Sequence, residues 1–265
     1  MLKNQFPALK TLFLIAEAVR GAHHLTSQFP LALDSLALEV RNGHGSALLD
    51  HFNKGIARIR TAYYDGMLFR RFRPSSDPWT RMTVSTFTNH GLSFVLRFES
   101  NSGARLDITH VNMWMWEVQS LHHLPQFAHI TELVIHEAAV MKHPSPRVPD
   151  LPSVITLVIV VKPKAIRPGG TIRFFSSDRG DEPLVRCAGL LIVEIVCIAR
   201  GPQLLDEHDV KHFLARDIDY DANKLTLLSF VGTDLASHSA YDWGEVAEEI
   251  RHRTSFIPDP NDVHN

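Results

Sequence analysis

The chain has 265 residues, of which 45% are hydrophobic and 21% are charged, and its formal net charge is −2. This balance excludes an intrinsically disordered chain, and it leaves no overall excess of basic residues for nucleic-acid binding. The two cysteines, Cys187 and Cys197, exclude a disulfide framework, so we expect buried thiols in a reducing compartment.

The apolar runs of the chain are short. VITLVIVV and LLIVEIVCIA are far shorter than the ~20 residues that a membrane-spanning helix needs. The first residues, MLKNQFPALKTLFL, lack the long apolar region and the cleavage site of a signal peptide. We therefore predict a soluble intracellular protein, cytoplasmic or nuclear, with no membrane partner.

Four stretches share one apolar rhythm. Residues 6–14, 29–38, 127–135 and 151–159 each open with an apolar residue, usually followed by proline, and continue as L-x-x-L-x-L. The anchors are Leu9, Leu12 and Leu14; Leu33, Leu36 and Leu38; Ile130, Leu133 and Ile135; and Val154, Leu157 and Ile159. Two later sets fit less regularly: Leu190, Val193 and Ile195; and Leu225, Leu228 and Phe230.

The spacing of these anchors predicts a repeat. Leu9 to Leu33 and Ile130 to Val154 are both 24 residues apart, and leucine-rich repeats have a period of about 20–29 residues. A single such strand cannot bury its apolar face, so we expect the strands to stack as a parallel sheet with convex helices outside it. Ordinary α/β strands with a chance period are the alternative.

Three connecting segments predict those helices, with N-caps at Ser46, Asp206 and Asp242. Glu245 follows Asp242 at the spacing of a capping box. The expected apolar faces are Leu49, Phe52, Ile56 and Ile59; Val210, Phe213 and Leu214; and Val246 and Ile250 in a closing helix.

The middle of the chain has a different pattern. Residues 80–116 alternate β-branched and aromatic residues, with turns at Asn89-His-Gly91 and Asn101-Ser-Gly103, which predicts an antiparallel β-meander insertion. We therefore expect one α/β domain over residues 1–265: an irregular, leucine-rich-repeat-like curved solenoid with parallel strands, convex helices and this central meander.

The motifs that would indicate a metal-binding site are incomplete in this sequence. Counting from Asp217, a calcium-binding EF-hand loop needs glycine sixth and glutamate twelfth, but Ala222 and Leu228 stand there, so we predict a solvated turn. His208 and His212 lie four residues apart without the glutamate of a metalloprotease, so we predict an exposed helix face.

Two further motifs favour structural roles. Gly43 and Gly45 begin a G-x-G-x-x-G pattern that ends in leucine, which favours a tight turn over a phosphate site. Trp114 and Trp116 share one side of a predicted strand, where core packing is favoured over a binding platform. We predict no catalytic residue, no cofactor and no metal.

Four stretches together resemble a known family: FPALKTLFL, FAHITELVIHEAAV, LPSVITLVIV and DVKHFLARDIDYDANKLTLLSFVG. They resemble the degenerate leucine-rich-repeat region of fungal F-box proteins of the basidiomycete type, over residues 6–40 and 125–255. The resemblance implies substrate recognition for a ubiquitin ligase. An F-box with its LPxEV-like start is not found, so binding to the ligase adaptor is not carried over.

This reading predicts a non-catalytic protein-interaction scaffold that binds a protein partner on the concave face of its sheet. The expected contact residues alternate with the anchors: Thr11, Phe13, Ser35, Glu132, Val134, Thr156, Val158, Glu194 and Ser229. Packing of these side chains beneath the meander or a terminal cap is the structural alternative. An α/β enzyme of unrecognised type, with dispersed catalytic residues, is the alternative function.

Overall fold

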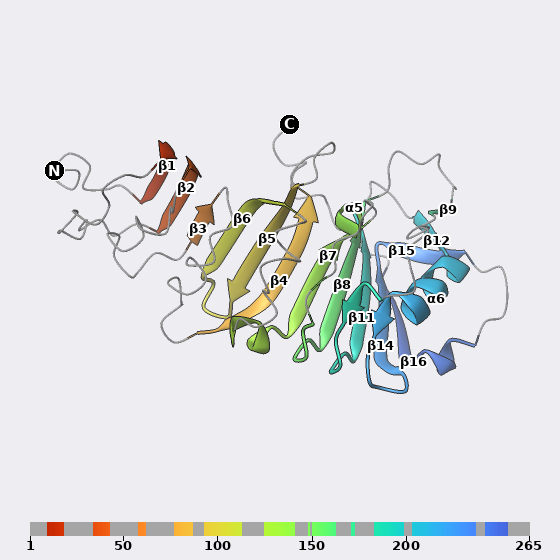
Figure 1. Ribbon diagram of the computed structural model, residues 1–265. Helices are drawn as coiled ribbons and strands as arrows, with labels where there is room; N and C mark the ends of the chain where they lie inside the picture. Colours follow the sequence, from red (N-terminus) through yellow and green to blue (C-terminus); the bar gives the residue numbers. More distant parts are fainter. Residues whose placement is uncertain are drawn as a thin grey trace. The chain divides into compact units, whose positions relative to one another are not determined.

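The computed structural model describes residues 10–18, 34–42, 58–61, 77–86, 93–112, 125–140, 148, 150–162, 171–172, 183–198, 203–236 and 242–253. These residues are mostly in strands, with few helices, and they pair in mixed sheets (Figure 1). The chain divides into two compact units, which we call unit 1 (residues 1–82 and 87–115) and unit 2 (residues 83–86 and 116–265).

Unit 1 contains parallel strands that end in an antiparallel hairpin. Its strand order is β1-β2-β3-β6-β5-β4, in which β1, β2, β3 and β6 run parallel and β5 runs antiparallel to β6. The strands are β1 (Thr11–Ala18), β2 (Ser35–Asn42), β3 (Arg58–Thr61), β4 (Trp79–Thr86), β5 (Ser93–Ser100) and β6 (Arg105–Asn112). Strand β4 contributes only its first half to unit 1.

The 24-residue repeat is confirmed in unit 1. Leu12 pairs with Leu36, and Leu14 pairs with Leu38, so the predicted anchors share rows. Just before β1, the carbonyl oxygen of Lys10 accepts hydrogen bonds from two successive backbone N–H groups, those of Asp34 (2.8 Å) and Ser35 (3.1 Å).

The predicted hairpin turn at Asn101-Ser-Gly103 is also confirmed. The N–H of Ser100 donates to the carbonyl of Ala104 at 3.0 Å, and the N–H of Gly103 donates back to the carbonyl of Ser100 at 3.1 Å. Gly103 has a φ of 85°, a conformation that favours glycine. Because β6 pairs with β3, the predicted insertion is part of the sheet of unit 1. The turn at residues 89–91 lies outside the described residues.

Unit 2 is built around one parallel sheet, ordered β7-β8-β11-β14-β16. These strands are β7 (Glu132–His136), β8 (Thr156–Val161), β11 (Ile192–Cys197), β14 (Leu225–Val231) and β16 (Ala247–Arg253). Two smaller parallel sheets accompany it: β10 (Val185–Arg186) with β13 (Ile218–Asp219), and β15 (Thr233–Ala236) with β12 (Gln203–Asp206) and β9 (Thr171–Ile172).

The predicted anchors of unit 2 align in two rows across its main sheet. One row contains Leu133, Leu157, Val193 and Leu228, and the second contains Ile135, Ile159, Ile195 and Phe230. Each of these side chains has 0% exposure. Because side chains alternate along a strand, both rows lie on one face and form the core of unit 2. The rhythm read from the sequence is therefore the actual strand register.

The double hydrogen bond seen at Lys10 recurs in unit 2. Thr131, Ile155 and Leu191 stand at the same repeat position, one residue after the first anchor. The carbonyl of each accepts from two successive N–H groups of the next strand unit, at 2.8–3.2 Å. The donors are Ile155 and Thr156, then Leu191 and Ile192, then Thr226 and Leu227. The same pair of hydrogen bonds thus occurs at the start of β2, β8, β11 and β14.

One predicted helix is confirmed. Helix α6 (Glu207–Arg216) begins at Asp206, whose Oδ1 accepts from the N–H of His208 at 2.9 Å and of Asp209 at 3.4 Å. Its predicted apolar face, formed by Val210, Phe213 and Leu214, is buried. The other helical elements described are α5 (Glu137–Val140) and the 3-10 turns η3 (Pro125–His129) and η4 (Trp243–Glu245). None of these described helices is long and apolar enough to cross a membrane.

The predicted closing helix is wrong. Asp242 does cap the short turn η4, but the chain then becomes strand β16, in which Ala247 and Ile250 pair with Leu225 and Leu228. Val246 and Ile250 fit the spacing of a helix, whereas Ala247 and Ile250 fit the spacing of the first two repeat anchors, and pairing with β14 selects the strand. The helix predicted over residues 46–59 is wrong at its end, because Ile59 lies in β3; its remaining residues are outside those described.

The acidic run is a turn only in its second half, because Ile218–Asp219 forms strand β13 and the chain bends at 221–224. Val185 pairs with Ile218, and Ile192 pairs with Leu227. Val185 and Ile192 are seven positions apart in the sequence, whereas Ile218 and Leu227 are nine positions apart. The bend at 221–224 accommodates the two extra residues. The solvated character predicted for this run is wrong at its start, because Asp217 has 1% exposure and its Oδ2 accepts a hydrogen bond from Arg216 at 3.1 Å.

Candidate functional site

The predicted contact residues divide between the two units. In unit 1, Thr11 pairs with Ser35 and Phe13 pairs with Ala37, which places Thr11, Phe13 and Ser35 on one side of β1 and β2. Thr11 is exposed, and Phe13 is 56% exposed. Thr11 and Phe13 therefore form a small exposed group beside the half-buried Ser35, with Phe13 as its large apolar side chain.

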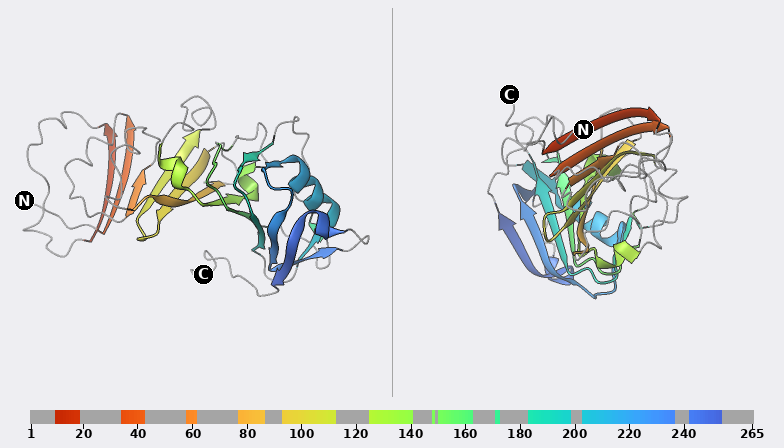
Figure 2. Two further views of the ribbon diagram at one scale, coloured as in Figure 1. Left: turned by 90° about the horizontal axis from the view of Figure 1, so that it is seen from below. Right: turned by 90° about the vertical axis from the view of Figure 1, so that its left-hand side faces the viewer.

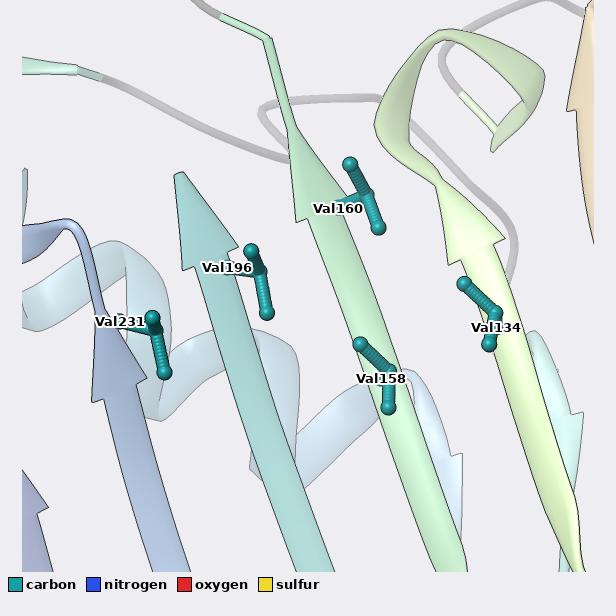
Figure 3. Packing of buried hydrophobic residues seen from close by; sticks show 5 residues of the cluster. All are labelled: Val134, Val158, Val160, Val196 and Val231. Atoms are coloured by element: carbon teal, nitrogen blue, oxygen red, sulfur yellow. The ribbon is translucent and has the colours of Figure 1, made fainter. Parts of the chain in front are cut away.

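The six predicted residues of unit 2 share one face of the main sheet. Val134, Val158, Glu194 and Ser229 form a single row that continues to Arg251. Glu132 and Thr156 are partners in another row of the same face. We call this side of unit 2 the valine face. Figure 2 shows helix α6 on one side of the unit 2 strands, and in Figure 3 α6 lies behind the strands from which the valines project.

Five valines pack together on this face: Val134, Val158, Val160, Val196 and Val231 (Figure 3). Their exposures are only 4–8%, and Ile198 packs against them. Val134, Val158 and Ser229 were expected to be accessible on an open face, and that expectation is wrong because all three are buried. Exposures this low mean that the valines are covered, so they do not form an open apolar surface.

Three members of this cluster were missed in the sequence. Val160, Val196 and Val231 form a row of their own, directly after the last anchors Ile159, Ile195 and Phe230. The signal was a β-branched residue following the last anchor in three successive units. Their alignment could be recognised only once the strand register was known.

Two polar groups lie beside the valines. Ser229 has 1% exposure, and its hydroxyl has no hydrogen-bond partner among the described residues. Its register partner Glu194 is half-buried, and the described part of the chain places no ion-pair partner against it. Arg251, the next residue in the row, instead donates to Oε1 of Glu249 at 2.6 and 3.1 Å. A buried hydroxyl without a partner costs free energy, so Ser229 needs an explanation.

Aromatic contacts hold β16 in place at the edge of this row. The ring of His252 stacks on Phe230 with 5.2 Å between centroids, and its Nδ1 lies 3.3 Å from Oδ1 of Asp234. Trp243 donates from Nε1 to Oε1 of Glu207 at 2.6 Å, and the Nζ of Lys211 lies 5.2 Å from the centroid of the Trp243 ring. His252 stacks on Phe230 in the same strand register that pairs Arg251 with Ser229.

The charged side chains that suggested metal sites have other partners or face solvent. The Asp217 carboxylate contacts Arg216, and that of Asp219 lies 3.6 Å from Arg186. His208 and His212 are exposed on α6, with 6.3 Å between ring centroids. Within the described ranges, no three His, Cys, Asp or Glu residues are grouped so that they could hold a metal ion.

Both thiols are buried, as predicted. Burial raises the pKa of Cys187 to about 12, with a further contribution from Asp150, and burial raises the pKa of Cys197 to about 11, with Glu137 adding to it. Thiols with such pKa values are protonated at neutral pH and react poorly as nucleophiles. Cys187 and Cys197 therefore behave as core residues of unit 2.

The predictions for Gly43, Gly45, Trp114 and Trp116 fall on residues outside those described. The features that bear on function are therefore the strand register, the valine cluster and the two polar groups beside it. Known proteins add no relative to these features: no family model, no curated protein and no solved structure matches the chain.

Proposed function

We propose that the chain is a leucine-rich-repeat-like solenoid that acts as a non-catalytic protein-interaction scaffold. Successive segments of unit 2 pass through three parallel ladders: β10, β11 and β12 pair in order with β13, β14 and β15. Such stacking of similar coils is the defining property of solenoid proteins. The recurring double hydrogen bond at the start of the strands supports the same repeat.

The valine face is the observation that carries the proposal. Half-buried polar residues border a cluster of aliphatic side chains here, an arrangement found at protein-binding surfaces. The valines themselves have exposures of only 4–8%, so a partner would meet mainly the polar residues beside them. A partner would supply the protruding side chain, and the half-buried residues Glu132, Thr156 and Glu194 would make polar contacts around it.

The resemblance to fungal F-box proteins gives this scaffold a specific role. In that family the repeat region recognises the protein that the ubiquitin ligase modifies. By this analogy the valine face would bind a substrate protein in the cytoplasm or nucleus. Adaptor binding requires the F-box, which the resemblance does not cover, so we assign only substrate recognition to these residues.

Site-specific photo-crosslinking in the native cell tests the proposal. A photoreactive phenylalanine at Thr156, on the valine face, is expected to capture a recurrent protein partner. The matched control carries the same group at Ala215, which is exposed on α6 at the opposite side. Equal capture at both positions, or capture at neither, would contradict a binding role for this face. Turnover of a metabolite by the pure protein would instead support the enzyme alternative.

A further inference from the structure

We infer that unit 2 binds a partner segment in which lysine or arginine flanks aliphatic residues, at an exposed strip where the main strands begin. The inference rests on the proposed scaffold function and names the chemistry of the partner. Four residues form the strip, which we call the aliphatic strip: Ile155, Leu191, Ile192 and Leu227. Ile155 is 43% exposed and Leu191 is 41% exposed, while Ile192 and Leu227 are half-buried.

The residues of the aliphatic strip are neighbours in the fold. The N–H groups of Leu191 and Ile192 both donate to the carbonyl of Ile155, at 3.0 Å each, and Ile192 is the register partner of Leu227. Among the described residues, four large hydrophobic side chains are exposed, and two of them belong to Ile155 and Leu191. Contiguous exposed aliphatic residues mark protein-binding sites, whereas single ones are common on any surface.

The aliphatic strip faces away from the core of unit 2. Its residues lie between the first and second anchors of their repeats, and these anchors, such as Val154 and Leu157, have 0% exposure. The register row of Ile192 and Leu227 lies two positions before the row of Val158, so the strip adjoins the valine face. A partner can therefore contact the strip directly, without displacing the buried valines.

Carboxylates border the aliphatic strip at both ends. The register row that contains Ile192 and Leu227 begins at Glu132 on β7 and ends at Glu249 on β16. Because the five strands are parallel, the turns that precede them lie at the same edge of the sheet (Figure 1). The described residues of these turns add exposed charges, which are Asp150, Asp221, Asp242 and Glu245 against Lys224. This edge attracts a cationic segment and repels an anionic one.

The same row sets the spacing of the partner's charges. Four strand-to-strand steps separate Glu132 from Glu249, which at about 4.8 Å per step gives about 19 Å. An extended segment rises about 3.3 Å per residue, so about six residues cover this distance. Glu249 pairs with Arg251, but the two side chains are 57% and 41% exposed, and such exposed pairs contribute little. A basic residue of the partner can therefore replace Arg251 beside Glu249.

A phage library of random dodecapeptides, selected on the full chain, tests the inference. We expect enrichment of peptides in which lysine or arginine flanks aliphatic residues. Leu191→Asp should weaken binding of a synthetic selected peptide by roughly 10- to 100-fold, because it places a charge at the centre of the contact. The matched control is Leu204→Asp, at an exposed leucine of β12 outside the strip. This control should change the affinity by less than about twofold.

An exchange of charges tests the basic flanks of the peptide. Glu249→Lys should weaken binding of the selected peptide by roughly fivefold or more. The same peptide with glutamate in place of its basic residues should bind Glu249→Lys more tightly than it binds the wild type. This reversal would not arise if Glu249 only stabilised β16. Raising the salt concentration from about 0.05 to about 0.5 M should weaken the basic peptide, because salt screens exposed charges.

Each contrary outcome has its own meaning. Selected peptides without basic residues, or binding that is unaffected by Leu191→Asp in a variant shown to be folded by circular dichroism, would overturn the inference. A dimer that sedimentation detects and Leu191→Asp dissociates would also overturn it, because the strip would then bind a second copy of the chain. Photo-crosslinking at Thr156 separates the two proposals. Capture that persists in Leu191→Asp would leave the scaffold proposal standing without the strip, whereas no capture in the wild type would overturn both.

Discussion

Unit 1 and unit 2 share the same strand motif, but the side chains on the second face of their sheets differ. In unit 1, Arg97 and Arg105 both contact the carboxylate of Asp107, at 2.8 and 2.6 Å, and Arg81 lies 3.9 Å from Glu99. Charges on this sheet are therefore balanced by their own neighbours. In unit 2 the corresponding face carries valines, an unsatisfied hydroxyl and a carboxylate without an ion-pair partner among the described residues.

The two faces therefore differ in whether their polar groups are satisfied within the chain. The carboxylate of Asp107 accepts hydrogen bonds from two arginines of its own sheet, and its role is to hold β5 to β6. A buried hydroxyl without a partner among the described residues, such as that of Ser229, costs free energy instead of stabilising the fold. The shared motif thus gives a self-sufficient surface in unit 1 and an unsatisfied polar group in unit 2.

The largest expected effect is loss of an anchor. Leu157→Ala should lower the free energy of unfolding by roughly 2–5 kcal/mol, because Leu157 is fully buried between Leu133 and Val193. Its neighbour on the opposite face, Thr156→Ala, should change it by less than about 0.5 kcal/mol. Urea unfolding followed by circular dichroism measures both. Leu106→Ala, at an equally buried position in unit 1, should match Leu157→Ala; equal costs for Leu157 and Thr156 would contradict the assigned register.

Acidic pH should weaken the ion pairs of unit 1 and lower its stability. Burial tends to raise the pKa of Asp107, but hydrogen bonds from Arg105 and Arg97 outweigh burial and lower it below its usual value. The stability gained from this carboxylate is therefore complete above the unfolded-state pKa and is lost as the pH falls through the folded-state value. Asp107→Asn should cost about 1–2 kcal/mol at pH 7 and should flatten the acid limb of the stability curve.

Asp219→Asn is the matched control in unit 2. Asp219 also faces an arginine, but at 3.6 Å and with both side chains more than half exposed. An exposed pair of this kind contributes about 0–1 kcal/mol, so its loss should leave the acid limb unchanged. Urea titrations between pH 7 and pH 2 compare the two variants. Parallel acid limbs for wild type and Asp107→Asn would contradict the role of the arginine pair.

Alkaline pH should lower the stability of unit 2, which contains both cysteines. Burial raises the pKa of Cys187 to about 12 and that of Cys197 to about 11. The folded thiols keep their protons at a pH where the unfolded thiols have lost them, so stability should fall above about pH 9. Each thiol should contribute about 1.4 kcal/mol per pH unit until its folded pKa is reached.

Single alanine variants of the cysteines isolate this effect. Cys187→Ala and Cys197→Ala should each reduce the slope of stability against pH between pH 9 and pH 10.5, whatever the cost of the cavity that each creates. The same folded protein at pH 8 should leave both thiols unmodified by a disulfide reagent. An unchanged slope in both variants, or rapid modification of the folded protein, would contradict burial of these thiols.

The sequence was sufficient to predict the strand register. The L-x-x-L-x-L rhythm requires two apolar side chains on one face of a strand, and the recurring turn before it sets where each strand begins, so Leu133, Leu157 and Val193 align as expected. The rhythm could not exclude the closing helix, because Val246 and Ile250 fit helical spacing while Ala247 and Ile250 fit the first two repeat anchors. Strand pairing with β14 decided that position, and pairing is not a local property of the sequence.

The candidate site was predictable only in part. Alternation along each strand correctly placed Glu194 and Ser229 on one face. It could not show that the valines would be buried, since the five valines come from four strands whose alignment is set by pairing. The missing partner of Ser229 depends on every neighbouring atom in space, so no pattern in the sequence carries it.

The smallest effect, and the sharpest comparison of the two units, concerns two buried serines. In unit 1 the Oγ of Ser100 lies 3.0 Å from that of Ser102 and accepts from the N–H of Ala104 at 3.2 Å, so Ser100→Ala should cost about 1 kcal/mol. In unit 2, Ser229→Ala removes a hydroxyl without a partner among the described residues, so the free energy of unfolding should be unchanged or rise by about 1 kcal/mol or less. Urea unfolding measures both. A cost for Ser229→Ala as large as that for Ser100→Ala would mean that the Ser229 hydroxyl is already satisfied, and the contrast between the two units would disappear.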